Sequence, residues 1–72
     1  MNEQEIKKMI TFYDGKETTL HIKLSNGRFY NGIFVEWETP QVMVLDDRVL
    51  GMIHVFLSQI VSIEEYKKEK EK

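Results

Sequence analysis

The Asn26–Gly27 pair, set between two runs of alternating apolar residues, constrains this chain more than any other feature. In residues 18–25, Leu20, Ile22 and Leu24 fall on one face and polar side chains on the other. Asparagine and glycine both tolerate positive φ, so the pair predicts a tight two-residue turn between antiparallel strands. The sequence therefore predicts a β-hairpin whose second strand covers residues 28–37.

The second strand of this hairpin carries apolar residues on both faces. Tyr30 and Phe34 share one face. The alternation assigns four further side chains to the opposite face: Phe29, Ile33, Val35 and Trp37. This is more apolar surface than one small core needs. Gly32 in the middle of the strand indicates a sharp bend or a close approach by another backbone segment.

The remaining segments predict one helix and three further strands. Residues 2–11 place Ile6, Met9 and Ile10 on one helical stripe, with Asn2 as the N-cap, and so short a helix must dock on the rest of the protein. The three strands are expected at residues 41–45, 49–56 and 60–64, with a polar turn at 46–48 and a tight link at 57–59.

Connections this short predict a mostly β fold. We expect a short N-terminal helix followed by a five-stranded, strongly bent antiparallel small barrel. Residues 1–65 would form this single domain, and residues 66–72 a charged, flexible tail.

Length and cysteine content limit how such a domain can be stabilised. A 72-residue chain buries only about 60% of its unfolded surface. The chain has no cysteine, and its two histidines, His21 and His54, are too far apart in sequence for a local metal motif. We therefore expect no metal and no cofactor, and either good packing or self-association as the source of added stability.

The charge distribution restricts the partners. The chain carries a net charge of −2, but the last seven residues carry +2 and residues 1–65 carry −4. A generic duplex-DNA binder would show a stripe of basic residues, and residues 1–65 contain no such stripe. No apolar run reaches the length of a membrane span, so we expect a cytoplasmic protein without membrane contact.

Catalytic patterns are weak. Asp46 and Asp47 follow one another beside Arg48, which is typical of a solvated turn. No serine has a histidine or lysine in an activating pattern. His21 lies on the polar face of its strand as a surface residue, and His54 is expected to pack or to lie at an interface. We predict a protein that is not an enzyme and has no small-molecule substrate.

Two stretches of the chain together resemble the signature motifs of the Sm-like family, which includes the Sm and LSm proteins and the bacterial host-factor RNA chaperone. The first matches at Leu24, Asn26, Gly27, Arg28, Tyr30, Gly32, Phe34, Trp37, Glu38, Met43, Leu45 and Asp47. Residues 55–63 resemble the second motif, a strand and a one-turn link before Ile60 and Ile63. The resemblance covers residues 3–65.

This resemblance implies a homo-oligomeric ring of about six to eight subunits that binds single-stranded RNA. In the family, the fourth strand of one subunit pairs with the fifth strand of the next. The implied interface residues are Met52, His54, Phe56, Ile60, Val61 and Ile63. The residues proposed to contact RNA, by stacking or from the loops that face the pore in relatives, are Trp37, Gln41, Phe56, Ser58 and Gln59.

Self-association also follows from the strands themselves. The expected fourth strand is apolar on both faces and contains no lysine or proline that would block pairing at an exposed edge. An edge of this kind favours pairing with another chain. The lysine-rich tail could then supply the attraction to RNA that the acidic body lacks.

Departures from the family pattern leave two alternatives open. Val42 stands where the family has an asparagine that bonds a uracil edge, and the basic residues of the second motif are replaced around Leu57. A ring that serves as a protein-interaction scaffold without binding RNA is one alternative. An SH3-like adaptor with a peptide groove near Trp37 and Tyr30 is the other.

Overall fold

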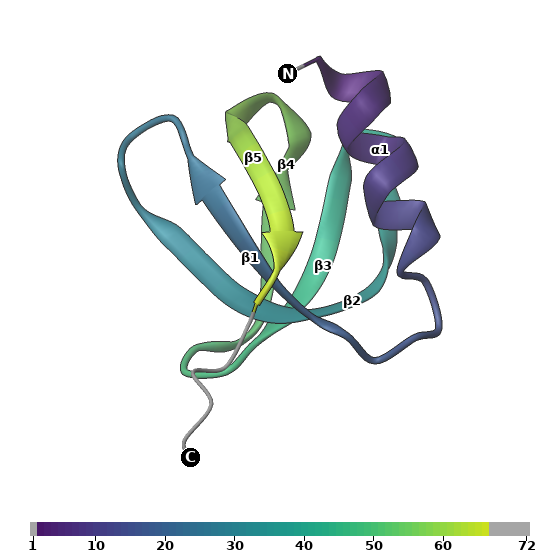
Figure 1. The fold of residues 1–72 in the computed structure, drawn as a ribbon, viewed down its shortest axis with the longest axis vertical. Helices are drawn as coiled ribbons and strands as arrows, with labels where there is room; N and C mark the ends of the chain where they lie inside the picture. Colours follow the sequence, from purple (N-terminus) through teal and green to yellow (C-terminus); the bar gives the residue numbers. More distant parts are fainter. Residues whose placement is uncertain (1, 67–72) are drawn as a thin grey trace.

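The computed structural model describes residues 2–66, which form one helix and five strands in the expected order (Figure 1). Their bounds are α1 Glu3–Phe12, β1 Thr19–Leu24, β2 Phe29–Thr39, β3 Val42–Asp47, β4 Gly51–Phe56, the 3-10 turn η1 Leu57–Gln59 and β5 Ile60–Glu65. The expected helix followed by a bent five-stranded antiparallel sheet is confirmed. Of the predicted tail, residues 67–72 lie outside the described residues.

Helix α1 begins at the predicted cap. The Asn2 side chain accepts a hydrogen bond from the Glu5 backbone N–H at 2.9 Å. The stripe formed by Ile6 and Ile10 is fully buried, because α1 packs against β5 and η1. Figure 1 shows the helix lying beside the curved sheet. The docking stabilises a helix too short to persist alone.

The five strands form one sheet in the order β4-β3-β2-β1-β5, and every neighbouring pair is antiparallel. The long strand β2 sweeps across the molecule and pairs with β1 on one side and β3 on the other. This leaves β4 and β5 as the two outer strands. The predicted face of β1 is confirmed, since Leu20, Ile22 and Leu24 are all buried.

At Gly32 the backbone of β2 lies close against that of β3. A Cβ atom at this position would lie 2.5 Å from the Asp46 carbonyl oxygen and 2.8 Å from the Asp47 Cα. Both are backbone atoms and have little freedom to move. The close backbone approach predicted for Gly32 is confirmed.

The second half of β2 does not keep the predicted alternation. Phe34 pairs with Leu45, but the next pair is Glu36 with Val44, so Val35 is an extra residue in a β-bulge. The bulge turns Trp37 to the same side as Phe34, and their ring centroids lie 5.4 Å apart. The prediction that these two aromatics face opposite ways is therefore wrong.

The start of β4 also differs from the prediction. The strand begins at Gly51, whose φ of +82° belongs to the turn geometry. Val49 and Leu50, expected within the strand, lie in the turn and are 87% and 62% exposed. Their apolar character suggested a strand, but the hydrogen bonds made by Asp47 hold them in a turn.

Candidate nucleic-acid interface

Four of the five residues predicted to contact RNA lie at one end of the sheet. The Leu57 backbone N–H donates to the Gln41 carbonyl at 3.0 Å, and Val42 pairs with Phe56 in the adjoining strands. These contacts join the β2–β3 turn to η1. The four exposed side chains brought to this end are Gln41, Phe56, Ser58 and Gln59.

Trp37, the fifth predicted residue, is placed differently. It is half-buried and packs against the hydrophobic core beside Phe34. The Lys7 Nζ atom of α1 lies 5.3 Å from the centre of the indole ring, a cation–π contact. A base could stack on this ring only if Lys7 moved aside, so Trp37 is less accessible than the four loop residues.

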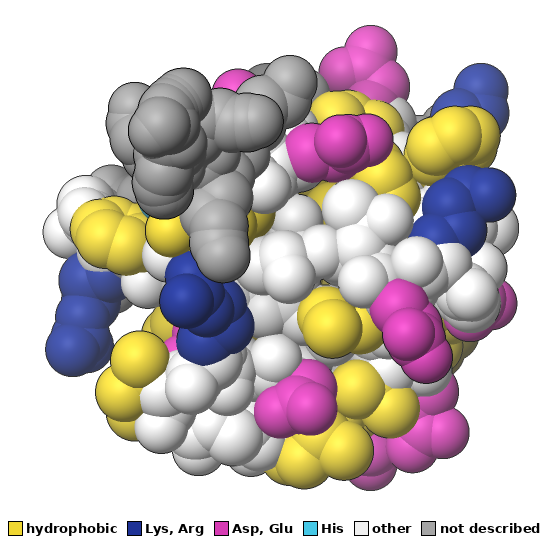
Figure 2. Space-filling model, turned by 60° about the horizontal axis from the view of Figure 1, so that its bottom comes forward, with side chains coloured by type: hydrophobic (Ala, Val, Ile, Leu, Met, Phe, Trp, Pro, Cys, Tyr) yellow, Lys and Arg dark blue, Asp and Glu magenta, His cyan; other side chains and the backbone are white. Residues whose placement is uncertain are grey.

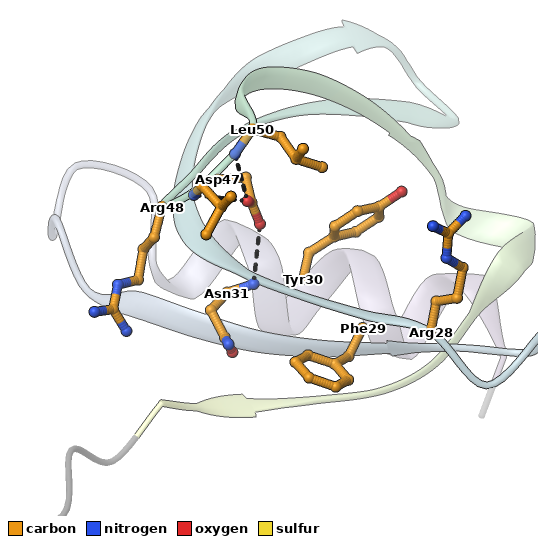
Figure 3. A pocket seen from close by; sticks show the side chains of 8 residues that line it. Arg28, Phe29, Tyr30, Asn31, Asp47, Arg48 and Leu50 are labelled. Carbon is orange, nitrogen blue, oxygen red and sulfur yellow. Dashed lines mark hydrogen bonds between the residues drawn. The ribbon is translucent and has the colours of Figure 1, made fainter.

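A second site, which the sequence reasoning missed, is an open pocket of about 520 Å³ between the start of β2 and the β3–β4 turn. It is lined by Arg28, Phe29, Tyr30, Asn31, Asp47, Arg48, Val49 and Leu50. Arg28 and Arg48 are the only arginines in the chain, and Figure 3 shows them at opposite ends of the pocket. Tyr30 and Leu50 point toward the space between them.

Asp47 holds this pocket together. Its carboxylate accepts hydrogen bonds from the backbone N–H groups of Val49 and Leu50 at 2.9 Å, and of Asn31 at 3.2 Å. The Arg48 backbone N–H also donates to the Asn31 carbonyl, at 2.9 Å. The turn is therefore fixed to β2. The prediction that Asp47 belongs to a solvated turn is wrong, because its side chain is buried against these donors.

The environment of Asp47 favours its ionised form. Burial raises the pKa of this carboxyl, but the hydrogen bonds from Leu50, Val49 and Asn31, with the nearby Arg48 charge, outweigh burial and lower the pKa. The carboxylate charge is directed at backbone N–H groups rather than at solvent. The two arginines therefore dominate the charge that this pocket presents outward.

The walls of the pocket combine cations with aromatic surface. Phe29 is 55% exposed, and the Arg48 guanidinium lies 5.1 Å from the centre of the Tyr66 ring. Tyr66 itself, assigned to the tail by sequence, donates its backbone N–H to the Thr19 carbonyl at 2.8 Å. Guanidinium groups pair with phosphates, and exposed rings stack on bases. The sequence feature that could have indicated this site is Arg28 directly followed by two aromatic residues, Phe29 and Tyr30.

His21 lies on the outer side of the sheet beside this pocket. Its Nδ1 atom lies 2.6 Å from the Asn31 Oδ1 atom, and its ring centroid lies 5.1 Å from that of Phe29. Phe29 and Asn31 both line the pocket. The predicted surface histidine is thus half-buried and hydrogen-bonded to a pocket residue.

The predicted interface residues divide into two groups. Ile60 and Ile63 are buried in this chain's own core, so their side chains are not available to a partner. The exposed members are Met52, His54, Phe56 and Val61. The sequence predicts that His54 either packs inside the protein or lies at an interface. Its side chain is exposed rather than packed, and its Nε2 atom lies 3.5 Å from the Glu38 Oε1 atom.

Acidic and apolar side chains are interspersed on the face drawn in Figure 2, and the basic side chains of its described part stand at separate places. Within residues 2–66, no three His, Asp or Glu side chains are grouped so as to hold a metal ion. The described part of the chain also contains no helix with the length and apolar character needed to cross a membrane.

Comparison with known proteins identifies the fold. No family model and no curated protein matches the sequence. The structure is similar to a 1.55 Å crystal structure of the pleiotropic translational regulator Hfq, with a TM-score of 0.68 and 18% sequence identity. The match covers 86% of this chain and 97% of that chain. The chain has an Sm-like fold.

The Sm-like fold agrees with the resemblance seen in the sequence motifs. At 18% identity the likeness establishes the fold, and the chemistry of the site rests on this chain's own residues.

Proposed function

We propose that this protein is a single-stranded RNA-binding module that assembles into a homo-oligomeric ring of about six to eight copies. Its site of action would be the cytoplasm, and we assign it no catalytic role. The observation that carries the proposal is the pocket that collects both arginines of an acidic chain around Phe29 and Tyr30. The Sm-like fold supports the same conclusion.

The mechanism follows from the charge and the aromatic surface of the pocket. Arg28 and Arg48 would pair with backbone phosphates, while Phe29 offers a ring on which a base can stack. The exposed residues at the other end of the sheet, Gln41, Phe56, Ser58 and Gln59, would add contacts to the same RNA strand or to a second RNA strand. Each subunit contributes a weak site, and the ring raises the overall affinity through multivalency.

Ring assembly would proceed through the two outer strands. Strand β4 exposes Met52, His54 and Phe56, and β5 exposes Val61. Pairing β4 of one copy with β5 of the next would satisfy the free backbone groups of both edges. A heterologous contact of this kind closes into a ring if the rotation between copies allows it.

Binding is tested by fluorescence anisotropy with labelled single-stranded oligonucleotides at about 50 and 200 mM salt. Replacing Arg28 and Arg48 together with glutamine should weaken binding and flatten the salt dependence by about 0.7 in log–log slope for each lost phosphate contact. Replacing Lys8 and Lys16 together with glutamine is the matched control, because it also removes two exposed positive charges, from α1 and the α1–β1 turn. Equal losses in the control and in the arginine variants would argue against this pocket.

A second candidate function is a protein-interaction scaffold that retains the ring but binds no RNA. The exposed Met52 and Phe56 on β4, next to Glu38, favour it as an apolar and acidic surface. Wild-type protein that forms a ring but binds neither oligo-U nor oligo-A at low salt would favour this second function. The SH3-like groove has less support, because Trp37 packs beneath Lys7 while Tyr30 lines the pocket.

A further inference from the structure

We propose that Tyr66 is a positioning residue that holds the Arg48 guanidinium at the pocket between β2 and the β3–β4 turn. This inference rests on the proposed RNA-binding function, and it names a residue that lies outside both sequence motifs. It is carried by the contact of the Arg48 guanidinium with the Tyr66 ring, whose centre lies 5.1 Å from the guanidinium carbon. Arg48 lines the pocket, whereas Tyr66 belongs to the segment that the sequence assigned to a tail.

The Arg48 side chain is exposed, but its backbone is fixed. Its N–H donates to the Asn31 carbonyl at 2.9 Å. The preceding residue, Asp47, holds the turn by accepting hydrogen bonds from Val49 and Leu50. The freedom that remains is rotation of the long arginine side chain, which a bound phosphate would have to restrict. A contact that restricts this rotation beforehand therefore raises the affinity for RNA.

An aromatic ring can restrict a guanidinium without neutralising it. Within residues 2–66 the Arg48 guanidinium makes no ion pair, because the Asp47 carboxylate is directed at backbone N–H groups. A carboxylate partner would occupy N–H donors of the guanidinium and cancel its charge. The face of a ring attracts the cation and uses none of its five N–H donors. Arg48 thus keeps the charge and the donors that a phosphate binds.

Tyr66 is a firm base for this contact because it continues the sheet. Strand β5 ends at Glu65, which pairs with Leu20, and the Tyr66 backbone N–H then donates to the Thr19 carbonyl at 2.8 Å. Tyr66 is half-buried. Its backbone is therefore anchored to β1, while the backbone of Arg48 is anchored to β2. The contact joins two fixed segments that are far apart in the sequence.

The size of the expected effect follows from the exposure of the pair. A cation–π contact at an exposed site favours the positioned guanidinium by about two- to fivefold. Tyr66→Leu removes the ring but keeps an apolar side chain and the backbone N–H that bonds Thr19. In fluorescence anisotropy at about 50 mM salt, this variant should bind labelled oligo-U and oligo-A about two- to fivefold more weakly than the wild type.

The decisive measurement is a double-mutant cycle between Tyr66→Leu and Arg48→Gln. Because Tyr66 acts through Arg48, the loss caused by Tyr66→Leu should disappear once residue 48 is an uncharged glutamine. A tyrosine ring that instead stacked directly on a base would cause the same loss in both backgrounds. Equal losses in the two backgrounds would therefore overturn the positioning role.

Conservative variants separate the ring from the hydroxyl group. Tyr66→Phe and Tyr66→Trp keep an aromatic face, so both should stay within about twofold of the wild-type affinity. A loss in Tyr66→Phe as large as that in Tyr66→Leu would contradict the proposal. Tyr13→Leu is the matched control, because Tyr13 lines a groove together with Tyr66 but its hydroxyl donates to Glu65. This control should leave RNA affinity unchanged, and thermal denaturation of every variant identifies any loss of folding.

Nuclear magnetic resonance of the free protein tests the contact without RNA. The ring current of Tyr66 should shift the side-chain resonances of Arg48, and this shift should vanish in Tyr66→Leu. Arg48 resonances that Tyr66→Leu leaves unchanged would overturn the positioning role and leave RNA binding intact. Wild-type protein that binds neither oligonucleotide would overturn the proposed function and this role with it.

Discussion

At the residue scale, Asp47 converts a polar turn into a fixed wall of the pocket. Because its pKa is lowered in the folded protein, its stabilising contribution is present above the unfolded value of about 4 and is lost as the pH falls through the folded value. We expect the wild-type protein to lose stability on acidification below about pH 4.

Asp47→Asn should show what this carboxylate contributes. An amide oxygen is a weaker acceptor for the Val49 and Leu50 N–H groups, and its NH₂ group opposes the third donor, so stability at pH 7 should fall by about 1–3 kcal/mol. Urea denaturation from pH 7 to pH 3 measures both effects. Asp46→Asn is the control, since Asp46 is exposed; an equal change in both variants would contradict the role of Asp47.

Gly32 provides a second prediction at the residue scale. Gly32→Ala places a Cβ against the backbone of Asp46 and Asp47 and should destabilise the protein by about 1–3 kcal/mol or more. Gly27→Asn is the comparison, because no atom lies within 4 Å of its Cβ position and its cost comes only from the strained φ of +90°, so its loss of stability should be smaller. A Gly32→Ala variant with an unchanged urea midpoint would show that the two strands can separate there without loss.

At the scale of the element, α1 depends on its buried stripe. Ile10→Ala should cost about 2–5 kcal/mol, because the side chain is fully buried between the helix and the barrel. Thr11→Ala alters the exposed neighbouring position and should change stability by less than about 0.5 kcal/mol. Circular dichroism during urea denaturation measures both, and similar losses would mean that helix propensity, rather than docking, determines the result.

Strand β4 gives the second prediction at this scale. Met52→Lys places a charge on an outer strand and should convert the proposed ring to smaller species by light scattering on a sizing column. Val49→Lys also replaces an exposed apolar residue, but in the turn, and should leave the mass unchanged. A ring that survives Met52→Lys would indicate that β4 is not the pairing edge.

At the scale of the whole molecule, residues 1–65 and residues 66–72 carry net charges of opposite sign. Residues 66–72 carry a net charge of +2 while the remainder carries −4. Deleting residues 67–72 should therefore weaken RNA binding and reduce its salt dependence, measured by anisotropy across a salt series. An unchanged slope would leave Arg28 and Arg48 as the main phosphate contacts.

Local chemistry made much of the fold predictable. The Asn2 cap and the alternation of β1 depend on residues close in sequence, and each has the predicted form. A hairpin forms at Asn26–Gly27 as predicted, but the expected two-residue turn is wrong: Leu24 donates its N–H to the Arg28 carbonyl, and only Gly27 has positive φ. The close packing at Gly32 was equally readable, because only glycine lacks the Cβ that would collide. The four loop residues also lie together, because the short link between β4 and β5 leaves little choice of path.

Long-range register decided the rest. The bulge at Val35 reverses the side of Trp37, and it arises from how β2 pairs with β3 rather than from the local pattern. Arg28 and Arg48 share a pocket because the β3–β4 turn is bonded to Asn31 through Asp47. The sequence by itself determined the β1–β2 hairpin, the cap and the buried stripes, since these need only neighbouring residues. Tertiary structure decided which distant side chains meet, since that depends on strand register.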